Sequence, residues 1–100
     1  MLNISEYKDE IEEVSKKLFV SRIDIFGSAL TDRFNDKSDI DLIVAFDESK
    51  VSNMFEQYFT LKEQLERVFH RSVDVVIDGS VRNPIFKQEI NATRRTVYVA

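Results

Sequence analysis

Amphipathic helical segments alternate with short apolar runs along this chain, and this alternation restricts the fold more than any other feature. Apolar residues recur every three or four positions through residues 4–18 and 51–69, which is the period of a helix with one buried face. Another helix is expected to begin at Asn83-Pro84, because proline suits the first helical position. Apolar or β-branched runs typical of strands lie at residues 23–26, 40–46, 73–77 and 96–99.

The order of these segments is helix, strand, short helical turn, strand, helix, strand, helix, strand, with residues 28–38 supplying the short turn and a polar loop. Helices interspersed with strands pack in layers against a sheet. The sequence therefore predicts an α/β (α+β) fold in which helices flank a small mixed β-sheet. At 100 residues the chain has the usual length of one domain, so we expect a single domain over residues 1–100.

The helical pattern also assigns aromatic side chains to the core. Phe55, Tyr58 and Phe69 lie on the apolar stripe of residues 51–69, and Phe59 lies beside it. We expect all four to be core residues rather than a partner surface.

The last helix and the residues after it carry two further expectations. Phe86 and Ile90 form the inward face of the helix that begins at Asn83-Pro84. Arg94-Arg95 is expected to lie in a solvated loop before the last strand, with a partner-facing or substrate-facing pair as the alternative.

Composition narrows the possible ligands. There is no cysteine, which excludes a disulfide scaffold and a thiolate metal site and fits a cytoplasmic location. The longest strictly apolar run, Leu42–Phe46, is far too short to cross a membrane. With a net charge of −4, the chain gains little from counterion release, so long nucleic acid is a poor main ligand. A small anionic ligand bridged by a cation remains open.

The pattern that carries chemistry is Gly27-Ser28, then ten residues, then Asp39-Ile40-Asp41. Residues two apart on a strand share a face, so Asp39 and Asp41 are expected to point the same way, about 6 to 7 Å apart at the backbone. Two carboxylates placed together repel each other. A divalent cation, Mg²⁺ or Mn²⁺, removes that repulsion and keeps open positions for substrate phosphates.

Gly27-Ser28 is expected where a strand passes into a helical turn. Glycine permits a positive φ or a close approach of the backbone to a ligand. Ser28 adds a hydroxyl, and the amides that follow it are expected to face an anion, although a plain helix cap is the alternative for this serine. A phosphate held by this turn and a metal held by Asp39 and Asp41 would belong to one triphosphate, as nucleotidyl transfer requires.

A third carboxylate comes from the run Val73-Asp74-Val75-Val76. An aspartate inside an apolar strand is costly unless something satisfies it. We expect Asp74 to be a further metal ligand or a general base that helps deprotonate the attacking hydroxyl. Asp78 lies on the same face by parity and is the alternative.

These residues resemble the signature of the minimal nucleotidyltransferases, a branch of the DNA polymerase β-like superfamily. The resemblance covers the chain from about residue 4 onward and implies a polymerase β palm-like fold with Asp39, Asp41 and Asp74 at one end of the sheet. Many relatives carry arginine directly after the serine, where this chain has Ala29. Arg33 and Lys37 are the candidates for the positive charge toward the phosphates, with plain surface charges as the alternative for both.

The resemblance also implies a role. Members of this branch are commonly antitoxins that attach AMP from ATP to a tyrosine of a helical HEPN-domain ribonuclease. Two alternatives stay open: a module that neutralises its partner by contact alone, and a transferase acting on a small molecule such as an aminoglycoside. The complete set of Asp39, Asp41 and Asp74 favours the enzyme, and 100 residues leave little room for a small-molecule acceptor domain.

Overall fold

Four strands form one mixed sheet in the computed structural model, which describes residues 2–100. The strands are β1 (Val20–Phe26), β2 (Ile40–Phe46), β3 (Val73–Ile77) and β4 (Arg95–Val99), in the spatial order β3-β2-β1-β4. β1 runs antiparallel to β2 and β4, whereas β2 and β3 are parallel. The predicted fold class, a small mixed sheet with flanking helices, is confirmed.

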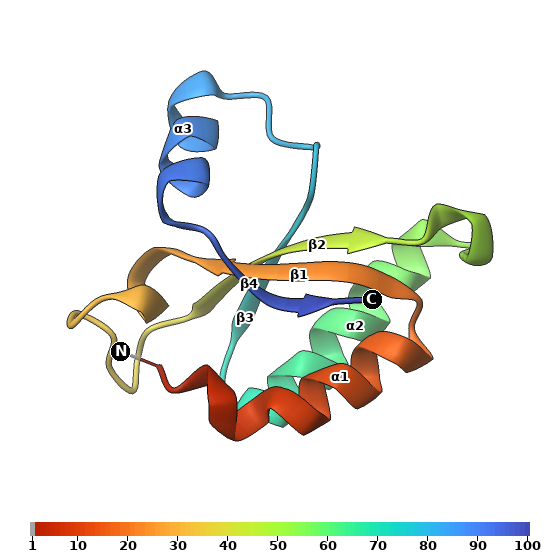
Figure 1. Ribbon diagram of the computed structural model, residues 1–100, viewed down its shortest axis with the longest axis horizontal. Helices are drawn as coiled ribbons and strands as arrows, with labels where there is room; N and C mark the ends of the chain where they lie inside the picture. Colours follow the sequence, from red (N-terminus) through yellow and green to blue (C-terminus); the bar gives the residue numbers. More distant parts are fainter. Residues whose placement is uncertain (1) are drawn as a thin grey trace.

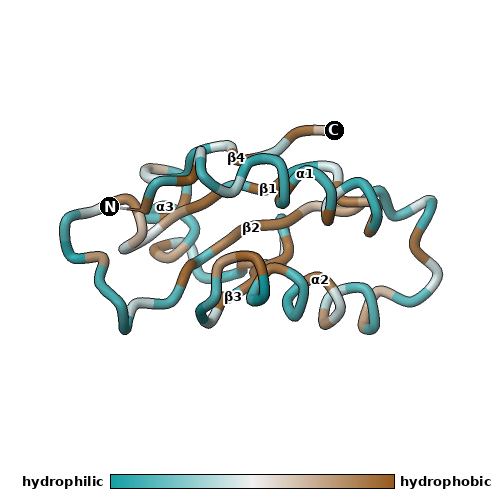
Figure 2. Tube along the Cα trace, turned by 90° about the horizontal axis from the view of Figure 1, so that it is seen from below, coloured by the Kyte–Doolittle hydropathy of each residue, from teal (hydrophilic) through white to brown (hydrophobic). Residues whose placement is uncertain are grey.

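Helices cover the two faces of this sheet unequally. α1 (Lys8–Lys17) and α2 (Met54–Phe69) lie together on one side of the strands, and α3 (Pro84–Thr93) lies on the other (Figure 1). The main core lies under α1 and α2 and includes Ile11, Ile40, Leu42, Leu61 and Leu65, each at most 2% exposed. Its hydrophobic positions run along β1 and β2 through the middle of the molecule (Figure 2).

Side-chain caps start α2 and α3. The Asn53 side chain accepts a hydrogen bond from the Glu56 amide, and the Asn83 side chain accepts from the amides of Ile85 and Phe86. With Pro84 in the first turn, α3 begins where the sequence predicts. α2 begins at Met54 rather than at residue 51, because the Asn53 cap and a 3₁₀ turn at Glu48–Lys50 precede it.

The first helix and the first strand also differ from expectation at their ends. The predicted helix over residues 4–18 opens as a 3₁₀ turn at Ile4–Tyr7 and continues as α1. β1 begins at Val20, three residues before the predicted strand, because Val20 is 3% exposed and pairs with Phe46. The polar residues Ser21 and Arg22 hide this start in the sequence.

The aromatic prediction for α2 is half wrong. Phe69 is 4% exposed, and the Tyr58 hydroxyl donates to the Val75 carbonyl at 2.8 Å. Phe55 is 73% exposed and Phe59 is 50% exposed, with their ring centroids 4.8 Å apart. The apolar stripe is wider than the helix face that the core can cover, so these two rings remain at the surface.

Within residues 2–100, no helix combines the length and the apolar character that a membrane crossing requires.

Candidate active site

The sheet face under α3 carries the predicted site residues. Along β2 the side chains alternate: Ile40 and Leu42 enter the core under α1 and α2, whereas Asp41 and Ile43 face the other side. Ile43 packs there with Phe26 and Ile90 of α3. This face therefore combines a small apolar cluster with acidic side chains at one end.

Asp41 and Asp74 are direct neighbours across the parallel strands β2 and β3. Adjacent strands lie about 4.8 Å apart, so two side chains in register on one face crowd each other. Burial, followed by the nearby carboxylates of Asp74 and Asp39, raises the pKa of Asp41 to about 6. The geometry thus brings two carboxylates together and makes Asp41 resist ionisation.

Asp39 stands just before β2, at the end of a loop that Arg71 holds in place. The Arg71 guanidinium donates to the carbonyls of Asn35 at 2.9 Å and Ser38 at 3.0 Å, and it lies 4.3 Å from the centre of the Phe34 ring. The backbone that leads into Asp39 is therefore tied to the end of α2, although the Asp39 side chain itself is exposed.

Gly27 has the positive φ that the sequence suggests, +77°, and it also lies against Asp41. A Cβ atom at this position would come within 2.6 Å of Asp41 Oδ2. The close approach thus involves a protein carboxylate, a contact that the sequence did not reveal. Ser28 follows in the 3₁₀ turn Gly27–Leu30, where its carbonyl accepts from the Thr31 amide at 3.0 Å.

A pocket of about 540 Å³ opens between this turn and α3. Gly27, Ser28, Arg33 and Asp41 line one side of it. Phe86, Glu89, Ile90 and Thr93 of α3, with Phe26 and Thr31, line the rest. Four predicted site residues therefore meet in one cavity, whereas Asp39, Asp74 and Lys37 do not contribute to its wall.

α3 departs from the predicted inward face. Ile90 is 3% exposed, as expected, but Phe86 is 40% exposed and only its edge meets Phe26, with 6.1 Å between the ring centroids. The helix covers the sheet with a single buried side chain, so Phe86 borders the open pocket instead of filling a core.

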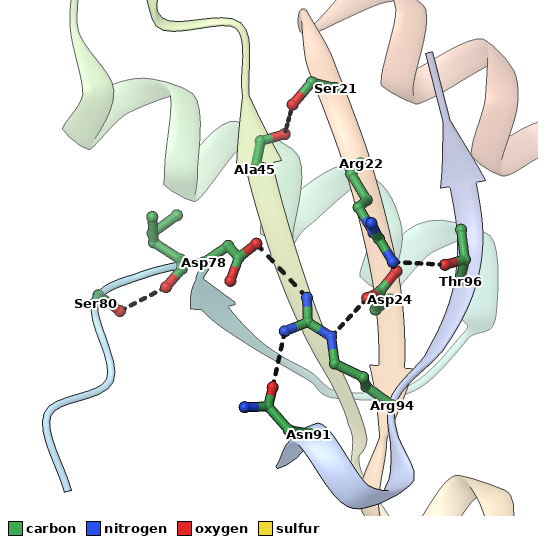
Figure 3. Close-up of polar contacts among 10 residues, drawn as sticks. Ser21, Arg22, Asp24, Ala45, Asp78, Ser80, Asn91, Arg94 and Thr96 are labelled. Atoms are coloured by element: carbon green, nitrogen blue, oxygen red, sulfur yellow. Dashed lines mark hydrogen bonds and ion pairs between the residues drawn. The ribbon is translucent and has the colours of Figure 1, made fainter. Parts of the chain in front are cut away.

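Asp78, the alternative third carboxylate, is engaged elsewhere. It lies after β3, and its Oδ2 atom is 3.6 Å from Arg94 Nη2. Arg94 also donates from Nε to the buried Asp24 at 2.7 Å (Figure 3). The predicted solvated loop at Arg94-Arg95 is thus wrong: Arg94 is bound to the sheet, and Arg95 is the first residue of β4.

The donor set suits a hard divalent cation. Across residues 2–100 no group of three or more His, Cys, Asp or Glu side chains lies close enough together to hold a metal ion, so Asp39, Asp41 and Asp74 are not assembled as one three-ligand set. Magnesium usually takes only one or two protein carboxylates, because it keeps several coordination positions for water and substrate phosphates. Burial and, after it, the carboxylates of Asp74 and Asp39 raise the pKa of Asp41, and a cation beside Asp41 and Asp74 would relieve the part that comes from repulsion.

Replacing Asp41 by Asn should stabilise the metal-free protein at pH 7. The folded-state pKa of about 6 lies above the unfolded value, so wild type loses stability as pH rises from about 4 through 6. Asparagine does not ionise, so the variant keeps this free energy of unfolding, which is about 1 to 2 kcal/mol after allowance for the partial exposure of Asp41. Urea unfolding at pH 7 and pH 4 should give a gain at pH 7 that vanishes at pH 4. A fall at pH 7 would instead make Asp41 a structural hydrogen-bonding residue.

Replacing Gly27 by Ala should destabilise the fold and displace the Asp41 carboxylate. The variant places a methyl group 2.6 Å from Asp41 Oδ2 and forces alanine into a left-handed backbone. Gly79→Ala is the matched control, because Gly79 has φ +85° and nothing within 4 Å of its added Cβ atom. Strain alone costs about 1 to 2 kcal/mol in both variants. Equal losses of unfolding free energy in the two would contradict the close contact with Asp41.

The sequence matches known proteins over most of its length. The family described as Polymerase beta, Nucleotidyltransferase matches residues 9–100. A candidate protein adenylyltransferase of Methanocaldococcus jannaschii is 36% identical over 94 residues, which cover 90% of this chain and 93% of the relative. The protein adenylyltransferase MntA of Thermococcus cleftensis is 30% identical over 88 residues, covering 88% of this chain and 83% of the relative.

The fold is similar to that of a solved toxin–antitoxin complex. In the structure of the tri-AMPylated HEPN toxin of Shewanella oneidensis with its MNT antitoxin, the matching chain has a TM-score of 0.66 and 16% identity. The match covers 98% of this chain and 74% of that chain.

Fold and sequence together define a nucleotidyltransferase domain. The chain belongs to the polymerase beta nucleotidyltransferase family, among relatives named as protein adenylyltransferases. The resemblance to the minimal nucleotidyltransferases, first seen in Gly27-Ser28 and Asp39-Ile40-Asp41, is confirmed.

Proposed function

We propose that this protein transfers AMP from ATP to a hydroxyl group of a partner protein and acts as the antitoxin of a toxin–antitoxin pair. The observation that carries the proposal is that Asp41, which lines the pocket beside Gly27, pairs in register with Asp74 on the neighbouring strand. Two crowded carboxylates next to an open cavity suit a metal-bound triphosphate. Because the donor is ATP, the proposal places the protein in the cytoplasm.

Asp39 and Asp41 would hold Mg²⁺ or Mn²⁺, with Asp74 as a further ligand or as the base. When bound, the cation neutralises charge that develops on the reacting phosphate. Asp74 is exposed, so an incoming hydroxyl can reach it and give up its proton there. The partner hydroxyl then attacks the α-phosphorus of ATP, and the bond to pyrophosphate breaks.

The pocket offers different surroundings to the two ends of a nucleotide. Gly27, Ser28 and Arg33 present backbone amides, a hydroxyl and a guanidinium, which suit phosphate oxygens. Phe26 and Phe86 form the apolar part, which suits stacking with a base. ATP would therefore lie with its phosphates toward Asp41 and its base toward α3.

A helical HEPN-type toxin is the proposed partner. Support comes from the Shewanella oneidensis complex, whose HEPN toxin carries AMP groups and is bound to an MNT antitoxin. Asp74 is exposed on the edge strand β3, so a protein acceptor can approach it directly.

Calorimetry of metal and ATP binding tests the proposal without a partner. Wild type should bind Mg²⁺ weakly alone and more tightly with ATP, because the phosphates complete the coordination shell. The double variant Asp39→Asn, Asp41→Asn should lose at least about tenfold in affinity for the metal–ATP complex. Undiminished binding of the metal–ATP complex by the double variant would mean that the metal does not bind at Asp39 and Asp41.

A further inference from the structure

α3 forms one wall of the pocket but is weakly held by apolar contacts. Ile90 is its only buried side chain within the described chain, and Phe86 meets Phe26 by its edge. In Figure 1 the helix stands apart from α1 and α2, on the opposite side of the sheet. Something else must set its position if the pocket is to keep its shape.

A buried carboxylate on β1 supplies a polar attachment. Asp24 is 0% exposed and lies on the same sheet face as Phe26, which lines the pocket. Its Oδ1 atom accepts from Arg22 Nε at 2.9 Å, and its Oδ2 atom accepts from Arg94 Nε at 2.7 Å. Burial raises the pKa of a carboxyl group, but the hydrogen bonds from Arg22 and Arg94 outweigh it and lower the pKa of Asp24, which stays ionised.

Arg94 joins three elements with one guanidinium group. It follows the last residue of α3, and its amide closes the helix by donating to the Ile90 carbonyl at 2.8 Å. Besides Asp24 on β1, its Nη1 atom donates to Asn91 on α3 at 3.3 Å, and its Nη2 atom lies 3.6 Å from Asp78 after β3 (Figure 3). A planar fork with several donors can serve these partners at once, which a lysine ammonium cannot.

We propose that Arg94 is a positioning residue for the nucleotide pocket, because it fastens the end of α3 to the buried Asp24. The inference rests on the proposed function, since it assigns the pocket to ATP. When Arg94 is lost, α3 occupies its binding position for a smaller fraction of time, and apparent affinity falls by that fraction. The carboxylates on β2 and β3 are unaffected, so the chemical step is preserved.

Arg22 provides the matched control. It binds the other oxygen of Asp24, and its Nη2 atom donates to Thr96 on β4 at 2.9 Å; among the described residues it makes no hydrogen bond to α3. Removing either arginine leaves Asp24 with one guanidinium partner, and both variants should therefore unfold more easily. Only Arg94→Gln should loosen α3.

The test compares Arg94→Gln with Arg22→Gln in the full chain by two measurements. Amide hydrogen exchange without nucleotide should accelerate about tenfold in α3 for Arg94→Gln alone. With Mg²⁺ and ATP, KM for ATP should rise about tenfold for Arg94→Gln, with kcat nearly unchanged, and stay at the wild-type value for Arg22→Gln. Arg94→Lys keeps a charge beside Asp24 and should give an intermediate KM if Arg94→Gln does not fold.

The outcomes separate this inference from the proposed function. Equal exchange in α3 and equal KM for the two arginine variants would overturn the positioning role while leaving AMP transfer intact. Wild type that fails to bind ATP would overturn the proposed function and the assignment of the pocket, and the exchange data would still decide whether Arg94 fastens α3.

Discussion

Asp41→Asn is expected to lower the rate of AMP transfer by at least about a thousandfold. Charge neutralisation at the reacting phosphate contributes several kcal/mol to the barrier reduction, and losing a ligand at the pocket edge removes much of it. The same variant is expected to be more stable than wild type at pH 7 without metal. A large loss of rate therefore cannot be explained by unfolding. Single-turnover assays with ATP and Mg²⁺ measure the rate.

Asp47→Asn is a suitable control for this result. Asp47 follows β2 at its other end, where its carboxylate accepts from Ser49 at 2.6 Å and pairs with Lys50. The variant removes the same charge just beyond the other end of β2, away from Gly27 and Asp74. Comparable losses in both variants would mean that net charge, rather than the site, controls the rate.

Asp74→Asn should lower kcat by about a hundredfold or more, the usual contribution of a positioned general base. Asp74 is exposed and pairs in register with Asp41, so it can receive the proton of an acceptor hydroxyl beside the reacting phosphate.

Asp78→Asn distinguishes the two aspartates of this segment. Asp78 faces Arg94 instead of Asp41, so its loss should leave kcat at saturating ATP unchanged. A large fall in kcat for Asp78→Asn with a normal kcat for Asp74→Asn would reverse their assignment.

The strands that carry the acidic residues could be read from sequence with little error. Ile40–Phe46 and Val73–Ile77 begin and end where predicted, because each is an apolar run bounded by polar residues. The pairing of Asp41 with Asp74 could not be read, since the register of two strands 33 positions apart along the chain is set by packing rather than by local pattern. Sequence parity therefore left Asp74 and Asp78 as alternatives.

Two further features of the site depend on contacts between residues that are distant in the sequence. Nothing near Gly27 in sequence shows that its Cα lies against Asp41, and nothing near Asp24 shows that Arg94 reaches it. The sequence does hold one signal for the second contact: Asp24 lies between two isoleucines in a strand, where a carboxylate needs a partner. Asp24 thus meets the criterion applied to Asp74, and its partner lies 70 residues away.

Mass spectrometry of the partner protein tests directly whether this chain attaches AMP to it. The proposed partner, a helical HEPN-type protein, should be incubated with ATP, Mg²⁺ and either wild type or the double variant Asp39→Asn, Asp41→Asn. Added AMP is expected on the partner with wild type only, together with relief of its toxicity by wild type only. No added mass with wild type, combined with equal relief by the double variant, would instead identify an antitoxin that acts by contact alone.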